Sequence, residues 1–211
     1  MAAAAAGRFV TLEGGEGVGK STQVKRLAEA LRDRGHDVVE TREPGGSPGA
    51  EAIRRLLVDG EVDRWTAETE ALLFAAARAD HVARVIRPAL DHGRWVLCDR
   101  FIDSSLAYQG GAGGVGMEAV MTLHGIGSGG LLPDRTLLLD LPLSDAHWRE
   151  LERDEGMLDR FGRKSERYHE GVAASFRELA DRHPDRFRIV DANGRVELVT
   201  QRLLAAIEDL L

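Results

Sequence analysis

The chain has 211 residues, 43% hydrophobic and 30% charged, which are the proportions of a globular protein with a substantial core. Its formal net charge of -7 argues against a nucleic-acid polymer as the main partner. Cys98 is the only cysteine, which excludes an intrachain disulfide, and no apolar stretch reaches membrane-spanning length, so we expect a cytoplasmic protein without a membrane partner.

The first predicted elements are a strand, a glycine-rich loop and a helix. Residues 8–13 are β-branched and apolar, and the apolar residues of 21–34 recur at helical spacing. Between them lies Gly14-Gly15-Glu16-Gly17-Val18-Gly19-Lys20-Ser21, a complete G-x-x-x-x-G-K-[ST] motif in the context that it requires. Such a loop points backbone N–H groups at phosphate oxygens, while Lys20 would bridge the β- and γ-phosphates and Ser21 would hold Mg²⁺. The motif predicts binding of a nucleoside triphosphate.

Strands and helices alternate along the rest of the chain. Further strands are expected at residues 37–41, 94–99, 136–140 and 186–191. Helices are expected at residues 48–58 with Ser47 as cap, 67–92 with a kink or break near Pro88, 104–109 with Asp103 as cap, 118–126, 144–155, 165–183 and 196–211, and a glycine-dense loop at 110–116. This order predicts a single α/β domain over residues 1–211, with a P-loop NTPase fold: a five-stranded parallel sheet flanked by helices, with ligands at the strand C-termini.

Four further motifs distinguish this chain from the switches and motors that share the phosphate loop. T-R-E-P-G-G at 41–46 follows the second strand, L-F-A-A-A-R at 73–78 lies in the long helix, D-R-F-I-D-S-S-L-A-Y-Q-G at 99–110 follows the third strand, and Asp191-Ala192 ends the fifth. With the phosphate loop, they resemble the thymidylate kinase family over nearly the whole chain. The resemblance implies ATP-dependent phosphorylation of dTMP to dTDP in dTTP biosynthesis, by in-line transfer of the γ-phosphoryl group, with Mg²⁺ and in a homodimer.

The acceptor site is expected around two side chains on one helix face. Phe74 and Arg78 are four residues apart, and a ring beside a fork of N–H donors suits a flat pyrimidine with carbonyl edges. The resemblance implies that Phe74 stacks on thymine, that Arg78 bonds its O4 and that Arg100 binds the dTMP phosphate; the alternative is a core Phe74 and a solvated Arg78. Further acceptor contacts that it implies come from Glu16, Pro44 (expected to be cis), Arg54, Ser104, Ser105, Tyr108 and Gln109.

For the donor and the metal ion, the resemblance implies a second group of residues. ATP contacts would come from Gly14, Gly15, Glu16, Gly17, Val18, Gly19, Lys20, Ser21, Thr22, Asp191 and Ala192. Asp99 would act with Ser21 behind Mg²⁺ or would orient Arg100. Glu16 would meet the acceptor sugar or a Mg²⁺-bound water rather than act as a strong base, because the acceptor phosphate oxygen is already anionic. Catalysis by Lys20, Arg100 and Glu16 is then positioning and charge neutralisation.

The phosphate loop carries no arginine, so the chain resembles the subtype that supplies cations from a mobile lid. That lid would span about residues 149–164 and offers Arg149, Arg153, Arg160 and Arg163, of which Arg153 and Arg160 are the preferred ATP contacts. Acidic residues nearly balance these arginines, so the alternative is a helix surface with ion pairs.

Other functions are less compatible with these residues. A GTPase switch needs an Asn-Lys-x-Asp motif, whereas the only asparagine, Asn193, precedes Gly194. A motor or transporter ATPase would need an extended partner interface. The closer alternative is another small P-loop kinase acting on a deoxynucleoside or a different monophosphate, although a nucleoside would leave Arg100 without an anion.

Overall fold

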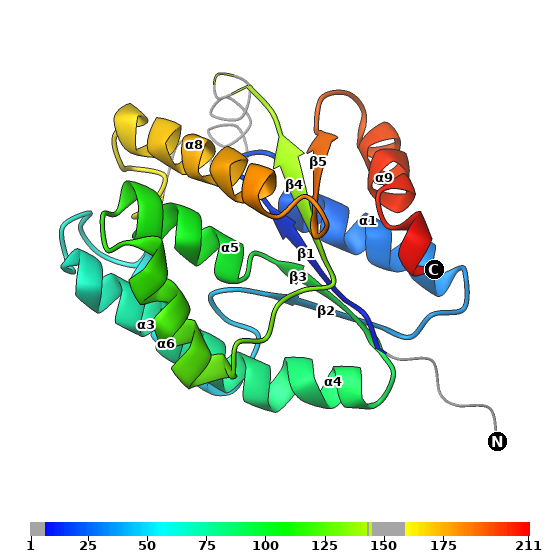
Figure 1. The fold of residues 1–211 in the computed structure, drawn as a ribbon, viewed down its shortest axis with the longest axis horizontal. Coiled ribbons are helices and arrows are strands. Elements are labelled where there is room, and N and C mark those ends of the chain that lie inside the picture. The colour runs from blue at the N-terminus through cyan, green and yellow to red at the C-terminus, as the bar shows by residue number, and fades with distance from the viewer. Residues whose placement is uncertain (1–6, 143, 145–158) are drawn as a thin grey trace.

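The computed structural model describes residues 7–142, 144 and 159–211. Its centre is a five-stranded, all-parallel sheet in the order β2-β3-β1-β4-β5 (Figure 1). The strands are β1 (Phe9–Glu13), β2 (Val38–Arg42), β3 (Trp95–Asp99), β4 (Arg135–Asp140) and β5 (Phe187–Asp191). The expected α/β fold is confirmed, and because β1 lies between β3 and β4, the loops after these three strands meet at one edge of the sheet.

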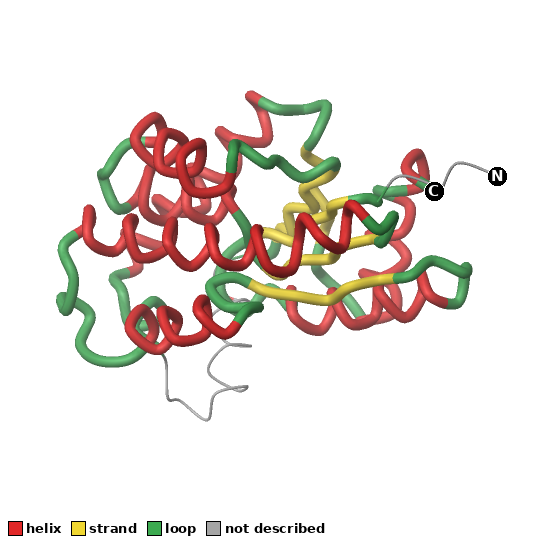
Figure 2. The backbone as a smooth tube through the Cα atoms, turned by 90° about the horizontal axis from the view of Figure 1, so that it is seen from below, coloured by secondary structure: helices red, strands yellow, loops and turns green. Residues whose placement is uncertain are grey.

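Helices cover both faces of this sheet (Figure 2). On one face lie α1 (Lys20–Arg32) and α9 (Val196–Ala205), the latter followed by the short 3₁₀ turn η3 (Glu208–Leu210). The remaining helical segments are α2 (Pro48–Val58), α3 (Ala67–His81), the π-helical η1 (Val82–Ile86), α4 (Arg87–Asp91), α5 (Ile102–Ser105), the π-helical η2 (Leu106–Ala112), α6 (Met117–Ser128) and α8 (Glu166–Arg182). In the part of the chain that the structure describes, no helix combines the length and apolarity needed to cross a membrane.

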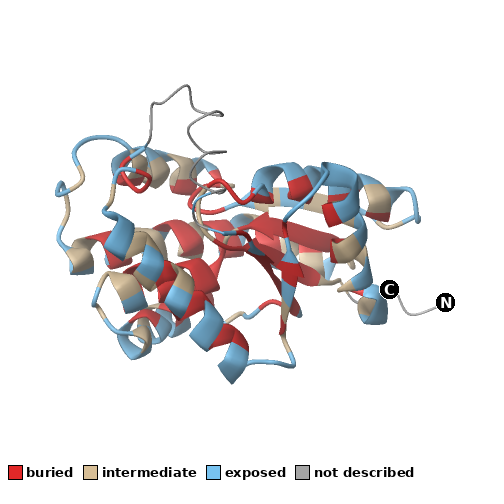
Figure 3. Cartoon of the chain, turned by 90° about the horizontal axis from the view of Figure 1, so that it is seen from above, coloured by how far each residue is buried: buried red, intermediate tan, exposed pale blue. Residues whose placement is uncertain are grey.

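The core is divided by the sheet into two hydrophobic clusters. Val10 and Leu12 of β1 pack on the side of α1 and α9, whereas Phe9 packs on the other side, with its ring centroid 4.8 Å from that of Phe101. Successive side chains of a strand point to opposite faces, and both faces of β1 are buried, including its polar residues Thr11 and Glu13. Figure 3 shows this buried layer continuing across the central strands.

The turn between β2 and α2 is built as the sequence indicates. The Ser47 hydroxyl accepts a hydrogen bond from the Ala50 N–H at 3.4 Å, which confirms Ser47 as the helix cap. Gly46 has a φ of 86°, and a Cβ there would lie 2.4 Å from Nε2 of His81. Only glycine fits this close approach, and the turn is thereby held against α3.

The helix expected over 67–92 is divided. α3 ends at His81, the wider π-helical turn η1 follows, and α4 begins at Arg87. Pro88 therefore lies in the first turn of a new helix, where its missing N–H removes no intrahelical bond. The expected break near Pro88 is confirmed. The helix changes at the π-helical turn η1, which precedes Pro88, and not at Pro88 itself.

The segment after β3 differs from expectation. Its helix begins at Ile102 and passes into η2, which extends to Ala112 and so takes in the first residues of the expected glycine-dense loop. Asp103 is not the cap: its buried carboxylate accepts hydrogen bonds from Arg186 Nη2 and Thr136 Oγ1, each at 2.9 Å. A long-range pairing with β4 and with the residue before β5 has replaced the local capping role.

Candidate active site

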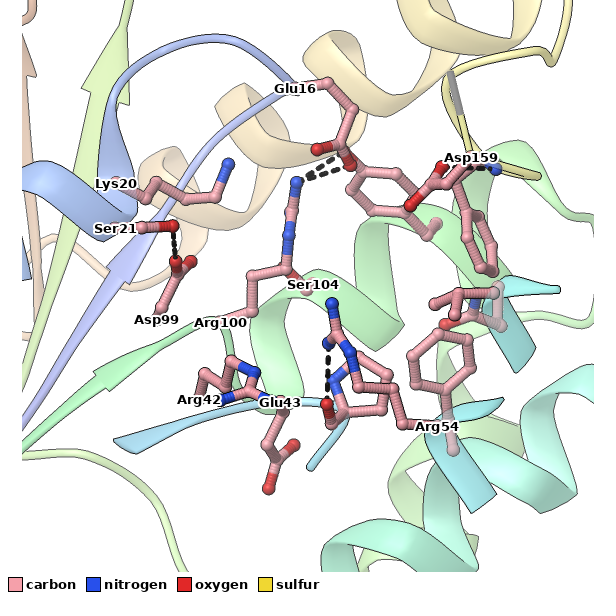
Figure 4. A pocket seen from close by; sticks show the side chains of 16 residues that line it. Glu16, Lys20, Ser21, Arg42, Glu43, Arg54, Asp99, Arg100, Ser104 and Asp159 are labelled. Atoms are coloured by element: carbon pink, nitrogen blue, oxygen red, sulfur yellow. Dashed lines mark hydrogen bonds and ion pairs between the residues drawn. The ribbon is translucent and has the colours of Figure 1, made fainter. Parts of the chain in front are cut away.

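A cavity of about 140 Å³ lies at the C-terminal ends of β1, β2 and β3 (Figure 4). The side chains around it come from the phosphate loop, the turn after β2, α2, α3, η2 and the residues before α8. Eleven of the expected site residues line it: Glu16, Lys20, Ser21, Pro44, Arg54, Phe74, Asp99, Arg100, Ser104, Tyr108 and Gln109. The lining also includes Arg42, Glu43, Val58, Asp159 and Phe161, which were not among the expected site residues.

The phosphate loop closes tightly against β4. Gly14 has a φ of 134°, and a Cβ there would lie 2.7 Å from the carbonyl oxygen of Leu139. Lys20 opens α1, and its Nζ donates to the carbonyl oxygen of Gly15 at 2.5 Å and to that of Gly14 at 3.3 Å. Burial, together with the positive charge of Arg100, lowers the pKa of Lys20 to about 8. A cation inside the loop and a helix N-terminus behind it form a site for phosphate anions.

Ser21 and Asp99 form a contact that suits a hard metal ion. The Ser21 hydroxyl, which follows the loop lysine, donates to Oδ2 of Asp99 at the end of β3. Oxygen donors are the ligands that Mg²⁺ prefers. Among the residues that the structure describes, no group of three or more acidic, His or Cys side chains could enclose a metal. The pair therefore fits an ion held by one or two protein oxygens together with substrate phosphates, which is the usual situation of Mg²⁺.

Arg100 occupies a strained position between the two halves of the cavity. It follows β3 with a φ of 67°, a conformation that is uncommon for a non-glycine residue. Its Nη1 donates to the Gly14 carbonyl at 2.9 Å and to Ser104 Oγ at 3.0 Å, and its Nη2 donates to Tyr108 OH at 3.1 Å. The guanidinium thus connects the phosphate loop to α5 and η2.

Glu16 forms the ion pair that holds this guanidinium. Its Oε1 accepts from Arg100 Nη2 at 2.6 Å and from Tyr108 OH at 3.1 Å (Figure 4). Burial favours the neutral acid, but the charges of Arg100 and then Lys20 outweigh it and lower the pKa of Glu16 to about 2. The same pairing outweighs burial at Arg100 and raises its pKa well above the ordinary value. Both groups are therefore charged at neutral pH.

Glu13 holds the backbone that follows Arg100 in place through hydrogen bonds to Phe101 and Ser104. Glu13 was not among the site residues expected from the sequence. It ends β1 and looks like an ordinary strand residue, yet its buried carboxyl accepts from the Phe101 N–H at 2.8 Å and from Ser104 Oγ at 2.5 Å. Burial, with the nearby Asp103 carboxylate, raises the pKa of Glu13 to about 8. Ser104 consequently links Glu13 to Arg100.

The far end of the cavity combines an aromatic wall with a buried arginine behind it. The rings of Phe74 and Phe161 both line the cavity, with centroids 5.7 Å apart. Arg78 is only 2% exposed, so it is not the solvated side chain of the alternative interpretation. Its Nε donates to Glu43 Oε2 at 2.8 Å and its Nη2 to Ser105 Oγ at 2.6 Å. Arg78 and Ser105 are absent from the lining of the described cavity, and Arg78 is linked to it through Glu43, which lines it.

α2 supplies a further cation, Arg54, which bonds the turn after β2. The Glu43–Pro44 peptide bond is cis, as expected from the resemblance. The Pro44 carbonyl accepts from Arg54 Nη1 of α2 at 2.7 Å (Figure 4), and burial lowers the pKa of Arg54. This contact holds the guanidinium of Arg54 at the cavity wall.

Arg160 occupies a different place from the one expected of an ATP contact. It is fully buried, and it donates to the carbonyl oxygens of Leu57 at 2.7 Å and Val62 at 3.2 Å and to Glu70 Oε2 at 2.5 Å. The structure gives it a packing role between α2 and α3, because all three of its donor nitrogens are engaged there. Arg163 is exposed and donates to the Gly60 carbonyl, while Arg149 and Arg153 lie outside the described residues.

Three of the expected ATP contacts, Thr22, Asp191 and Ala192, lie away from this cavity. Thr22 is exposed on the first turn of α1. Asp191 ends β5, and its Oδ2 lies 3.0 Å from Nη1 of Arg202. Ala192 is buried, and its N–H donates to the Asp140 carbonyl at 2.8 Å. These residues are at the same edge of the sheet as the phosphate loop but beyond β4.

Comparison with known proteins gives one consistent answer. The thymidylate kinase family model matches residues 12–203. A thymidylate kinase of Rhizorhabdus wittichii is 65% identical over 97% of this chain and 99% of its own, and one of Caulobacter vibrioides is 50% identical over 97% and 96%. The crystal structure of a thymidylate kinase from Ehrlichia chaffeensis superposes with a TM-score of 0.76 at 29% identity, covering 96% of this chain and 99% of that one.

Proposed function

The chain belongs to the thymidylate kinase family and phosphorylates dTMP to dTDP with ATP as the donor, and we propose that the cavity described above is where the reaction takes place. The observation that carries this proposal is the position of Arg100. Its guanidinium bonds the phosphate loop on one side, through Gly14, and the acceptor side on the other, through Ser104 and Tyr108. A cation at that boundary can reduce the repulsion between two phosphoryl groups that approach one another.

The proposed mechanism is in-line transfer assisted by positioned charges. In the conformation described here, Glu16 neutralises Arg100 at 2.6 Å. When dTMP enters, its phosphate replaces the Glu16 carboxylate on Arg100, and Glu16 becomes available to accept from the sugar hydroxyl. Lys20 neutralises charge on the β- and γ-phosphates. Deprotonation of the acceptor is unnecessary because its phosphate oxygen is already anionic, so positioning and electrostatic stabilisation supply the rate enhancement.

Mg²⁺ is proposed as the metal ion of the reaction. Ser21 would hold it directly, and Asp99, which accepts the Ser21 hydroxyl hydrogen bond, would act behind it. When bound, the ion neutralises charge on the β- and γ-phosphate oxygens. Ser21 lies in the first turn of α1, after the phosphate loop that follows β1, and Asp99 ends the adjacent strand β3, so the two side chains meet at the C-terminal edge of the sheet.

The thymine ring is proposed to lie against Phe74, with Tyr108 beneath the sugar, where a 2′-hydroxyl would clash. Arg54 gives a second contact to the acceptor nucleotide. Arg78 is proposed to bond O4 of thymine. In this conformation its guanidinium is hydrogen-bonded to Glu43, which lines the cavity, and to Ser105, which does not. Arg153 stays the proposed lid contact to ATP.

A homodimer through α3 and α6 is also proposed. The two helices pack closely, since a Cβ on Gly127 of α6 would lie 3.3 Å from Cβ of Ala79 on α3. α3 and α6 lie side by side at one end of the molecule (Figure 1). Leu72 of α3 is 55% exposed and Ile126 of α6 is 81% exposed, so each helix carries an exposed apolar side chain. Sedimentation analysis of the wild type and of Ile126→Glu tests the proposed dimer, and a monomeric wild type would refute it.

A cytoplasmic location, where ATP and nucleotide pools are found, is also proposed.

A coupled ADP-release assay tests the site. We expect turnover with dTMP to exceed turnover with dUMP, UMP and dCMP, and thymidine to be inactive because it lacks the anion for Arg100. Phosphorylation of thymidine at a rate similar to that of dTMP would refute the role given to Arg100. Equal turnover of UMP and dUMP would refute the placement of Tyr108 beneath the sugar.

A further inference from the structure

Glu70 of α3 is a buried carboxylate that faces three hydrogen-bond donors. Its Oε2 accepts from Arg160 Nη2 at 2.5 Å, and its Oε1 accepts from Gln109 Nε2 at 3.0 Å. Lys164 Nζ lies 3.5 Å from the same Oε1. Gln109 lines the cavity, whereas Glu70 does not. Glu70 therefore reaches the cavity through the Gln109 side chain.

This contact determines which end of the Gln109 amide is left for a ligand. A carboxylate with two cationic neighbours accepts hydrogen bonds, whereas an amide has one donating nitrogen and one accepting oxygen. The nitrogen of Gln109 must face Glu70, because two oxygens would repel one another at 3.0 Å. The polar atom of Gln109 that stays available is its oxygen, Oε1.

We propose that Glu70 is a positioning residue that fixes Gln109 as a hydrogen-bond acceptor for the base of the acceptor nucleotide, an inference that rests on the proposed location of dTMP. Thymine carries a hydrogen on N3 and donates it, whereas N3 of cytosine is an acceptor. An accepting Gln109 oxygen pairs with thymine and repels cytosine. A site that leaves a buried polar group unpaired rejects the wrong substrate strongly.

Arg160 keeps the Glu70 carboxylate from rotating. Its three donor nitrogens are all engaged, with Leu57, Val62 and Glu70, and the side chain is fully buried. Lys164 is less constrained, because its side chain is 16% exposed. The arginine that the sequence suggested as an ATP contact therefore acts, in this proposal, on the base end of the site.

Glu70→Gln tests the proposal. Arg160 requires an oxygen, so the nitrogen of the new amide faces Gln109, whose own amide must turn over and present its nitrogen to the base. We expect the ratio of kcat/KM for dTMP to that for dCMP to fall roughly 10- to 100-fold, chiefly through a higher KM for dTMP. The double exchange Glu70→Gln with Gln109→Glu keeps the total charge and returns an acceptor to the cavity, so it should restore the preference for dTMP.

Lys164→Met is the matched control, because it perturbs the same cluster but leaves the Glu70 acceptor in place; the dTMP-to-dCMP ratio should not change. If Glu70→Gln lowers kcat/KM for both nucleotides equally, the residue acts only in packing and the proposal is overturned. Should that variant fail to fold, Glu70→Met with Arg160→Met replaces the buried ion pair by apolar side chains, which proteins often tolerate. Gln109 is then able to turn, and an unchanged ratio overturns the proposal.

Gln109→Leu distinguishes this inference from the proposed site. A lower dTMP-to-dCMP ratio in Gln109→Leu, with no change in Glu70→Gln, would refute the role of Glu70 alone. An unchanged ratio in Gln109→Leu would refute both the placement of thymine beside Gln109 and the inference built on it.

Discussion

Replacing Glu16 by glutamine should lower the stability of the substrate-free protein and should increase the rise in Tm that dTMP binding produces. The Glu16–Arg100 ion pair is largely buried, with side-chain exposures of 21% and 14% and a separation of 2.6 Å. The pKa of Glu16 falls from 4.5 to about 2, and at about 1.4 kcal/mol per pKa unit this corresponds to about 3 kcal/mol of folding free energy. We expect Glu16→Gln to lower the free energy of unfolding by about 1–3 kcal/mol, or the Tm by roughly 2–12 °C for a chain of this length.

The pH dependence of this loss follows from the direction of the pKa shift. A carboxyl whose pKa is depressed by folding contributes its stability above its unfolded pKa of 4.5, and that contribution is lost as the pH falls through about 2. The difference in Tm between wild type and Glu16→Gln should therefore be largest at pH values well above 4.5, such as pH 7, and should decrease as the pH falls below 4.5.

Thermal unfolding with and without dTMP provides the assay. If the dTMP phosphate replaces Glu16 on Arg100, binding restores the missing anion in the variant, and dTMP should raise its Tm more than that of the wild type. Glu29→Gln is the control, because its pair with Arg26 is exposed and should contribute less than about 1 kcal/mol. A Tm for Glu16→Gln equal to that of the wild type at pH 7, or a smaller response to dTMP, would refute the reasoning.

Four further predictions concern residues of the site. Lys20→Ala should abolish phosphoryl transfer while circular dichroism shows the fold retained, since it removes the cation beside the transferring group; near-normal turnover would contradict the assignment. In the wild type, kcat/KM for ATP should decline as the pH rises through about 8, where Lys20 loses its proton, and a flat profile up to pH 9.5 would exclude a required charge on Lys20. Arg78→Ala should reduce discrimination among pyrimidine monophosphates in the ADP-release assay, and an unchanged preference for dTMP counts against a contact to thymine. Arg160→Met should lower the free energy of unfolding by about 3–5 kcal/mol in a denaturant titration, because the buried Glu70 carboxylate loses the partner of its Oε2 oxygen and keeps only Lys164 and Gln109 at Oε1; a stable variant with only a lower kcat would favour the ATP contact instead.

The sequence was sufficient wherever a short stretch of chain carries its own physical signal. The phosphate loop is defined by glycines that permit unusual dihedral angles and by the lysine and serine that follow them, and the structure places Lys20 and Ser21 at the start of α1. Continuous apolar runs marked the parallel strands, and Ser47 marked the start of α2. The alternation of strands and helices then implied a parallel sheet with its ligands at the strand C-termini, where Arg100 was expected, whereas the adjacency of β1 and β3 and the pairing of Arg100 with Glu16 came from the structure.

Tertiary structure decided the roles of charged residues that lack a local signal. Arg160 and Glu70 are 90 positions apart, and only the packing of the segment before α8 against α2 and α3 brings them together. Asp103 stands where a helix cap would stand, yet it pairs with Arg186, 83 positions further on. Glu13 has the sequence context of any strand end, yet it bonds the backbone of Phe101. Periodicity and motifs report which backbone a segment prefers, whereas the partner of a buried charge depends on which distant segment the fold places against it.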